Sequence, residues 1–190
     1  MKDAAYDNMR DGFERGYVQV YTGNGKGKTT AGIGLVLRAL GAGLSVFYAQ
    51  FIKGAKYSEI EMLERLGDNL APGVRLTCKQ YGQGRFIMRE PAPEEVEAAR
   101  EGLREAREAM KSGEYQLVVL DEANVAAKLK LFAEEDLLAL IDEKPEAVEL
   151  VLTGRGAGEK VIEAADLVTE MREIKHYYQK GVKARRGIES

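Results

Sequence analysis

Short apolar runs and longer amphipathic segments alternate along the chain. The apolar runs predict strands at residues 16–22, 44–51, 74–81, 115–122, 148–154 and 167–171. The segments between them predict helices at residues 29–43, 58–67, 93–112, 133–143 and 157–166. Strands that are apolar on both faces and alternate with helices are typical of parallel sheets. The pattern therefore predicts an α/β fold with a mainly parallel central sheet and helices on both faces.

Two features of this pattern predict how individual helices begin and pack. Ser58 and Glu61 form a capping-box pattern at the start of the predicted helix at residues 58–67. Gly32 and Gly34 would weaken the helix at residues 29–43 if it were isolated. We expect both glycines to let that helix pack closely against the sheet.

The chain length predicts one domain. With 190 residues, the chain matches the usual size of about 100–200 residues per domain. We assign residues 16–190 to this domain. Residues 1–15 are polar and are expected to form an arm outside it, either disordered or closing over the site.

Composition narrows the class of protein. The formal net charge is −3, which argues against a broad polyanion-binding surface and against nucleic acid as a partner. The single cysteine, Cys78, cannot form an internal disulfide, which fits a reducing compartment. The sequence has no apolar run near the ~18 residues of a membrane span and no apolar core of a signal peptide. We expect a cytoplasmic protein that does not enter a membrane.

A glycine- and lysine-rich stretch, TGNGKGKTT, occupies residues 22–30 between the first predicted strand and the following helix. Its glycines would let backbone N–H groups approach phosphates closely. Lys28 is expected to reach phosphate oxygens, and Thr29 to offer its hydroxyl to Mg²⁺. The P-loop pattern G-x-x-x-x-G-K-S/T is matched at its end, but Thr22 stands at the first glycine position. A glycine-rich turn without a ligand is the alternative.

Two acidic residues, Asp121 and Glu122, end the fourth predicted strand. Ligands of parallel sheets bind at the carboxyl ends of the strands, where the P-loop motif is also expected. In P-loop proteins an acid at such a strand end holds or orients Mg²⁺, although a solvated turn is the alternative. The residues therefore predict a Mg²⁺–nucleoside triphosphate site, with hydrolysis and other transfers both open.

Several further stretches, in this order, make the chain resemble the P-loop cob(I)alamin adenosyltransferases. They are YTGNGKGKTTA, QFIKG, VVLDEANVA, LVLTGRGA, ADLVTEM and KHYYQKGVKARRGIE, and they extend over most of residues 16–190. The resemblance implies a RecA-like P-loop fold, a homodimer and an external reductant. It also implies the reaction: a Co(I) corrinoid attacks C5′ of ATP, a cobalt–carbon bond forms, and triphosphate leaves.

The resemblance also implies roles for individual residues. Lys28 and Mg²⁺ would stabilise the charge that grows on the departing triphosphate. Thr29 and Glu122 would ligate Mg²⁺, with Asp121 supporting them, and Lys28 and Glu122 are therefore the residues assigned to catalysis. The residues expected to bind nucleotide are Asn24, Gly25, Lys26, Gly27, Lys28, Thr29, Thr30, Lys53 and Arg155.

One segment departs from the family pattern. Many members have G-x-G-F-T-W, whose aromatic side chains press on the lower face of the corrin, whereas this chain has GQGRFI at residues 82–87. Arg85 and Ile87 stand where phenylalanine and tryptophan are expected, and Phe86 is one position away. We expect corrinoid contact near Phe86, and the preferred substrate could be an incomplete corrinoid.

The C-terminal tail suggests other contacts. His176, the only histidine, could approach corrin or phosphate or be structural. The tail is basic and aromatic through Lys175, Tyr177, Tyr178, Lys180, Lys183, Arg185 and Arg186. It is expected to contact substrate phosphates, a corrinoid or a partner subunit, with nucleic acid as the alternative.

Two rival functions remain open on the sequence alone. The first is a P-loop ATPase or kinase that acts at the γ-phosphate. The second is a non-catalytic module that binds nucleotide or nucleic acid. The released phosphate product separates the transferase from the first rival, and salt-dependent binding of DNA or RNA would favour the second.

Overall fold

A parallel sheet forms the centre of the computed structural model, which describes residues 14–54, 57–82 and 90–189. Within these residues the sheet has six strands in the order β3-β2-β4-β5-β1-β6. The strands are β1 (Val18–Thr22), β2 (Val46–Gln50), β3 (Leu76–Gln80), β4 (Leu117–Asp121), β5 (Glu149–Thr153) and β6 (Leu167–Glu170). Each pairing is parallel, so all the carboxyl ends meet at one edge of the sheet.

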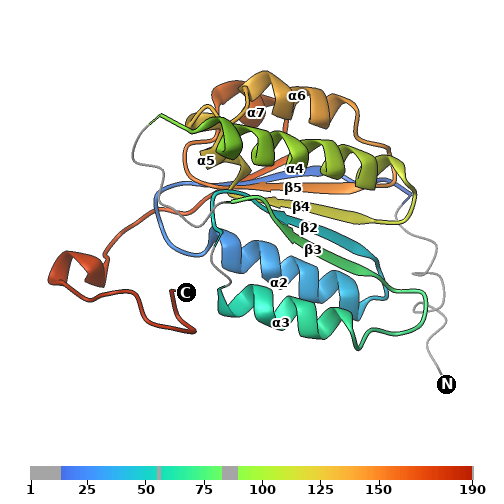
Figure 1. Ribbon diagram of the computed structural model, residues 1–190, viewed down its shortest axis with the longest axis horizontal. Helices are drawn as coiled ribbons and strands as arrows, with labels where there is room; N and C mark the ends of the chain where they lie inside the picture. Colours follow the sequence, from blue (N-terminus) through green and yellow to red (C-terminus); the bar gives the residue numbers. More distant parts are fainter. Residues whose placement is uncertain (1–13, 55–56, 83–89, 190) are drawn as a thin grey trace.

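Helices cover both faces of this sheet (Figure 1). On one face lie α2 (Lys28–Gly41) and α3 (Ser58–Gly67). On the other lie α4 (Pro93–Lys111), α5 (Ala123–Lys128), α6 (Glu134–Asp142) and α7 (Glu159–Ala164). This arrangement confirms the predicted α/β architecture.

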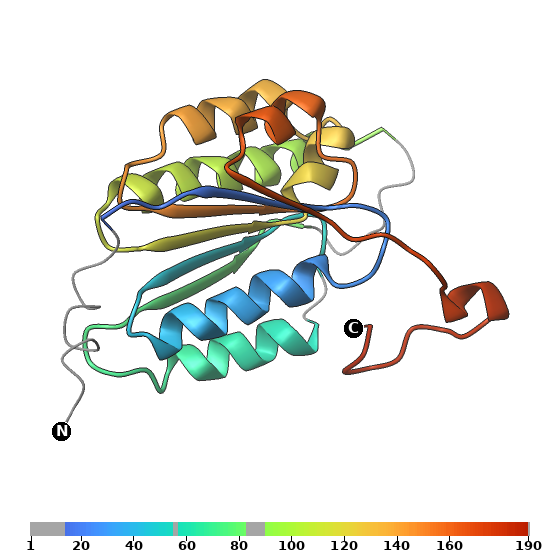
Figure 2. The same ribbon diagram turned by 180° about the vertical axis from the view of Figure 1, so that it is seen from behind.

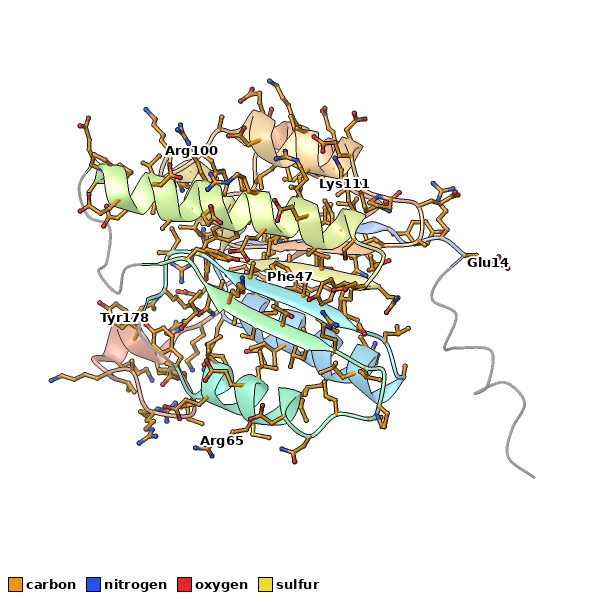
Figure 3. The ribbon with its side chains drawn as sticks, turned by 45° about the vertical axis from the view of Figure 1, so that its right-hand side comes forward. Glu14, Phe47, Arg65, Arg100, Lys111 and Tyr178 are labelled. Atoms are coloured by element: carbon orange, nitrogen blue, oxygen red, sulfur yellow. The ribbon has the colours of Figure 1, made fainter. Side chains whose placement is uncertain are left out.

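Alternate side chains of the central strands enter two separate cores. In β2, Val46 and Tyr48 pack toward α2 and α3, whereas Phe47 and Ala49 pack toward α4. Phe47 meets the ring of Tyr115 edge-on at 5.6 Å between ring centroids, and Figure 3 shows Phe47 beneath α4. Because both faces are covered, every residue of β2 and β4 is buried, which explains their unbroken apolar runs.

The structure corrects three local predictions. Tyr57, not Ser58, is the N-cap of α3, and no capping hydrogen bond comes from its side chain. Helix α5 was not predicted, because its six residues are too few to show a helical period. A Cβ at Gly32 would lie 3.5 Å from Thr153 and 3.6 Å from Val119, so this glycine packs on the sheet as expected, whereas a Cβ at Gly34 would meet nothing within 4 Å.

The C-terminal segment leaves β6 and turns back toward the N-terminal ends of α2 and α3 (Figure 2). It contains a 3₁₀ helix, η2 (Tyr177–Lys180). The predicted arm, residues 1–15, and the predicted corrinoid contact at Phe86 fall outside the described residues, except for residues 14 and 15. Within the described residues, no helix combines the length and the apolar character needed to cross a membrane.

Candidate nucleotide site

The P-loop occupies the turn between β1 and α2, as the motif predicts. Gly27, directly before α2, has φ 119°, a conformation that side chains other than glycine rarely adopt. The N–H of Gly25 donates to the carbonyl of Met171, 2.7 Å away, which ties the loop to the end of β6. A Cβ at Gly25 would lie 2.8 Å from that same carbonyl oxygen. The glycine spacing is therefore required by backbone geometry even without a ligand.

The exception to the P-loop pattern at Thr22 has a structural reason. Thr22 is the last residue of β1, and its hydroxyl accepts a hydrogen bond from the N–H of Ala157 at 3.2 Å. The next residue, Gly23, takes the left-handed conformation with φ 93°. The loop thus turns at Gly23, and Thr22 links the P-loop to the segment after β5.

Asp121, at the end of β4, is completely buried and lies under the P-loop. Its Oδ2 accepts hydrogen bonds from Gln50 at 2.9 Å and from the Thr29 hydroxyl at 3.3 Å. Its Oδ1 accepts from the hydroxyl of Thr153 at 2.7 Å. Because both oxygens have partners, Asp121 fixes the orientation of Thr29 at the first turn of α2.

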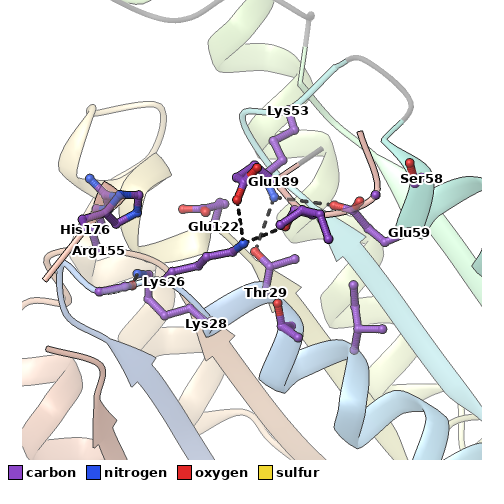
Figure 4. A pocket seen from close by; sticks show the side chains of 16 residues that line it. Lys26, Lys28, Thr29, Lys53, Ser58, Glu59, Glu122, Arg155, His176 and Glu189 are labelled. Carbon is purple, nitrogen blue, oxygen red and sulfur yellow. Dashed lines mark hydrogen bonds and ion pairs between the residues drawn. The ribbon is translucent and has the colours of Figure 1, made fainter. Parts of the chain in front are cut away.

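Lys53 follows β2, and its side chain also lies beside Thr29 and Asp121. Its Nζ lies 3.3 Å from the Thr29 hydroxyl, 3.7 Å from Asp121 and 3.8 Å from Glu59 (Figure 4). The preceding residue, Ile52, has φ 68°, which is strained for a β-branched side chain. This turn directs Lys53 to the P-loop instead of continuing the strand.

Glu122 also has a left-handed backbone, with φ 61°, and its N–H donates to the Thr153 hydroxyl at 3.1 Å. Its side chain lines a cavity at the P-loop, which is described below. Burial, followed by the charge of Asp121, raises the pKa of the Glu122 carboxyl above its usual value. A cation beside Glu122 would reverse this cost and favour the charged carboxylate.

Lys28 is nearly buried, with 6% of its surface exposed, and its ammonium donates to the carbonyl of Gly25 at 2.7 Å. Burial and then the neighbouring charge of Arg155 lower the pKa of Lys28. Both causes oppose a positive charge there, and an anion bound in the loop would offset both. The electrostatics therefore favour an anionic ligand next to Lys28.

A cavity of about 570 Å³ opens between the P-loop, the strand ends and the C-terminal segment. Ligand sites commonly have volumes of about 300–1,000 Å³. Among the predicted nucleotide-binding residues, those that line it are Gly25, Lys26, Gly27, Lys28, Thr29, Thr30, Lys53 and Arg155, together with the predicted metal ligand Glu122. Asn24 is exposed beside the loop and does not line the cavity.

The cavity also includes residues that were not assigned to the nucleotide site from the sequence. Ser58 and Glu59 come from the start of α3, and Gly187, Ile188 and Glu189 come from the C-terminal segment. The tail motif was visible in the sequence, but its return to the P-loop depends on a tertiary contact. His176 lines the cavity and has a structural role as well, because its Nδ1 accepts from the N–H of Tyr178 at 3.0 Å.

The oxygen donors around Thr29 fit Mg²⁺. This ion usually takes only one or two protein carboxylates and completes its coordination with phosphate and water. Thr29 and Glu122 present hard oxygen atoms to the cavity, and Asp121 supports Thr29 from below. The described part of the chain contains no group of three or more His, Cys, Asp and Glu residues that could hold a metal, so a site made only of protein ligands is not found there.

The sheet, the P-loop and the buried acid below it define a P-loop nucleotide-binding protein of the RecA-like class. A KaiC-like protein from Pyrococcus horikoshii has the same fold, with a TM-score of 0.55 and 19% identity over 86% of this chain and 76% of that one. The family model described as ATP:corrinoid adenosyltransferase BtuR/CobO/CobP matches residues 14–190, and the chain belongs to this family.

Three named relatives agree with the family match. A corrinoid adenosyltransferase from Sinorhizobium sp is 37% identical over 181 residues, which cover 93% of this chain and 81% of the relative. A corrinoid adenosyltransferase from Pseudomonas aeruginosa is 37% identical over 177 residues, covering 93% and 84%. The corrinoid adenosyltransferase CobA of Salmonella typhimurium is 33% identical over 178 residues, covering 93% and 86%. The resemblance inferred from the motifs is thereby confirmed.

Proposed function

We propose that the chain transfers the 5′-deoxyadenosyl group of ATP to the Co(I) centre of a corrinoid and releases triphosphate, as its family membership implies. The observation that carries this proposal is the cationic cavity at the P-loop, lined by Lys26, Lys28, Lys53 and Arg155. The electron pair of Co(I) forms the cobalt–carbon bond, and the C5′–oxygen bond breaks. Its electron pair remains on the triphosphate, which gains negative charge.

Lys28 is proposed to stabilise this growing charge. Its pKa is lowered by burial and by Arg155, so an anion that becomes more negative relieves an existing electrostatic cost. The backbone N–H groups of residues 24–30 are proposed to hold the phosphates, with Lys53 and Arg155 at the edges. The reaction needs no general base, because the attacking cobalt carries no proton.

Mg²⁺ belongs to the same proposal. When bound, it would neutralise part of the triphosphate charge. Thr29 and Glu122 are proposed as its ligands, with Asp121 as the residue that orients Thr29. Glu122 would then be held as a carboxylate despite its burial.

The remaining expectations also belong to this proposal. The family resemblance implies a homodimer and an external reductase that supplies the Co(I) state. A cytoplasmic location is supported by the single cysteine, Cys78. Phe86 is proposed to contact the corrinoid, and whether that corrinoid is complete depends on the segment that contains Arg85 and Ile87.

Product analysis tests the proposed reaction. The protein is mixed anaerobically with Mg²⁺, ATP and chemically reduced cobalamin, and the spectrum is followed for a light-sensitive cobalt–carbon product. We expect this product together with intact triphosphate. Diphosphate and phosphate without a cobalt–carbon bond would instead indicate an ATPase. An incomplete corrinoid is assayed in parallel, because Arg85 and Ile87 replace the family aromatics.

Substitution of Lys28 tests how the site works. Lys28→Met should lower kcat/KM by roughly 10²–10³, the usual effect of removing one donor that stabilises transition-state charge. Lys160→Met is the matched control, because Lys160 lies on α7, is exposed and pairs with Glu135 on the surface. Equal activity of the Lys28 variant and the control would contradict the role of Lys28.

A further inference from the structure

The C-terminal segment, residues 172–189, contacts the P-loop through a small part of its length. We call it the C-terminal strap. All its residues are exposed except His176, Tyr177 and Glu189, which are partly buried. Figure 3 shows Tyr178 on the outer part of the strap, and 74% of its surface is exposed. The partly buried residues thus mark where the strap meets the body of the molecule.

Glu189 is the centre of that contact. Its Oε1 lies 3.1 Å from Lys26 Nζ and also accepts from the hydroxyl of Tyr177. Its Oε2 accepts from the backbone N–H of Arg185 at 2.9 Å and from the guanidinium at 3.2 Å. The Arg185 guanidinium lies over the Tyr177 ring, 5.1 Å from its centroid. One carboxylate therefore joins two parts of the strap to the P-loop.

The charge state of Glu189 agrees with this arrangement. Hydrogen bonds from Arg185 and then from Tyr177 hold its pKa well below the usual range, so it remains a carboxylate. Lys26 shows the complementary effect, because the hydrogen bond to Glu189 raises its pKa. The side chain of Glu189 is 16% exposed, which limits competition from water for its hydrogen bonds.

The contact gives the cavity its outer wall. Lys26 Nζ also donates to the carbonyl of Ile188 at 2.8 Å, which brings the strap backbone to the P-loop (Figure 4). Gly187, Ile188 and Glu189 line the cavity that Lys28 and Thr29 also line. Because about 570 Å³ remains between them, the strap leaves room for a ligand. The strap therefore borders the cavity without filling it.

We propose that Glu189 is a positioning residue for ATP: it holds Lys26 and the C-terminal strap so that the nucleotide binds between the P-loop and Ile188. This inference rests on the proposed function, since it assumes that the cavity takes ATP. The carboxylate acts through Lys26 and the strap and takes no part in bond making. Its removal leaves Lys26, Tyr177 and Arg185 without their common acceptor. ATP then has to order the strap as it binds, which weakens binding.

The test measures ATP binding without a corrinoid, so that adenosyl transfer does not contribute. Titration calorimetry with MgATP is carried out on the wild type, on Glu189→Gln and on Glu173→Gln. Glu173 lies on the same strap, bonds to Gln179 and does not line the cavity. We expect Glu189→Gln to weaken binding at least about tenfold, the effect of losing a charge-assisted hydrogen bond. Glu173→Gln should stay within about twofold of the wild type. Wild-type affinity in Glu189→Gln would overturn the proposal.

A double-mutant cycle shows whether Glu189 acts through Lys26. Lys26→Met, Glu189→Gln and the double variant are compared in the same ATP titration. If the contact is the cause, the double variant should bind about as well as Lys26→Met alone. Independent, additive losses would overturn the proposed route. The cycle remains informative if Glu189→Gln also lowers thermal stability, because it compares affinities of folded proteins.

A fluorescence measurement follows the strap itself. The chain has no tryptophan, so Tyr178→Trp introduces a single reporter at an exposed position of the strap. We expect its anisotropy to fall in the Glu189→Gln background and to rise again when MgATP is added. Unchanged anisotropy would contradict the anchoring role. The result is independent of the reaction: binding of MgATP without formation of a cobalt–carbon product would refute the proposed function but not the role of Glu189.

Discussion

Asp121 and Glu122 are neighbours in sequence but have different surroundings. Asp121 is buried with partners on both oxygens, whereas Glu122 enters the cavity and carries a raised pKa. The sequence predicted the acidic pair at a strand end, and the family resemblance implied that Glu122 ligates Mg²⁺ while Asp121 supports it. The partners of Asp121 could not be predicted, because Gln50 and Thr153 come from other strands. The contact of Glu189 with Lys26 could not be predicted either, because it joins residues near opposite ends of the chain.

The first prediction concerns Glu122 in the ligand-free protein. Its pKa is raised above the ordinary 4.5 in the folded state, so above that pH the unfolded chain loses its proton first. The folded state therefore loses stability as pH rises until its own carboxyl group ionises. Glu122→Gln cannot ionise and should be more stable than the wild type at neutral pH, but not below pH 4.5.

Urea unfolding in the presence of a chelator, from acidic to neutral pH, measures this difference. Glu163→Gln on the exposed face of α7 is the control and should follow the wild type at each pH. A Glu122→Gln variant that is no more stable at neutral pH would show that burial of this carboxyl is not costly.

At the scale of elements, the sequence predicted the strands well for two reasons. β2 and β4 are mostly apolar and buried throughout, and β1 alternates buried with partly buried residues. The sequence prediction failed where tertiary packing decides the outcome. Helix α5 is short and follows its N-cap Glu122, whose left-handed backbone has no sequence signal. Gly34 was expected to face the sheet, yet it lies on the exposed side of α2.

The exposed position of Gly34 gives the second prediction. Gly34→Ala should raise the free energy of unfolding by about 0.5–1 kcal/mol, because alanine loses less backbone entropy in a helix. Its Cβ would meet nothing within 4 Å. Gly16→Ala should have the opposite effect, since a Cβ there would lie 2.3 Å from the backbone of Val148. Urea unfolding of both variants tests the prediction, and a destabilised Gly34→Ala would contradict it.

At the scale of the whole molecule, the cavity connects nucleotide binding to global stability. It is built from the ends of several strands and the C-terminal strap, so a ligand that bridges them binds only the folded chain. A ligand at 100 times its Kd stabilises a protein by about 2.7 kcal/mol. For a chain of this size that corresponds to a rise in Tm of about 5–11 °C.

The third prediction is that this rise requires Mg²⁺. MgATP should raise Tm by several degrees, and a chelator should remove most of the increase. Thr29→Val keeps the shape of the side chain but removes the hydroxyl that bonds to Asp121. Its response to ATP should be nearly the same with and without Mg²⁺. Scanning calorimetry checks this, and a full Mg²⁺ effect in Thr29→Val would exclude Thr29 as a ligand.

The position of β1 in the sheet has a consequence for how the protein is made. Among the described strands, β1 pairs only with β5 and β6. The N–H of Tyr17, directly before β1, donates to Glu149, 132 residues later in the chain. During synthesis, the strand that leads into the P-loop leaves the ribosome early but has no neighbour until most of the chain has been translated. Closing so long a loop is slow. The nascent chain must therefore keep an apolar strand unpaired, and this interval is when assistance from a chaperone would matter most.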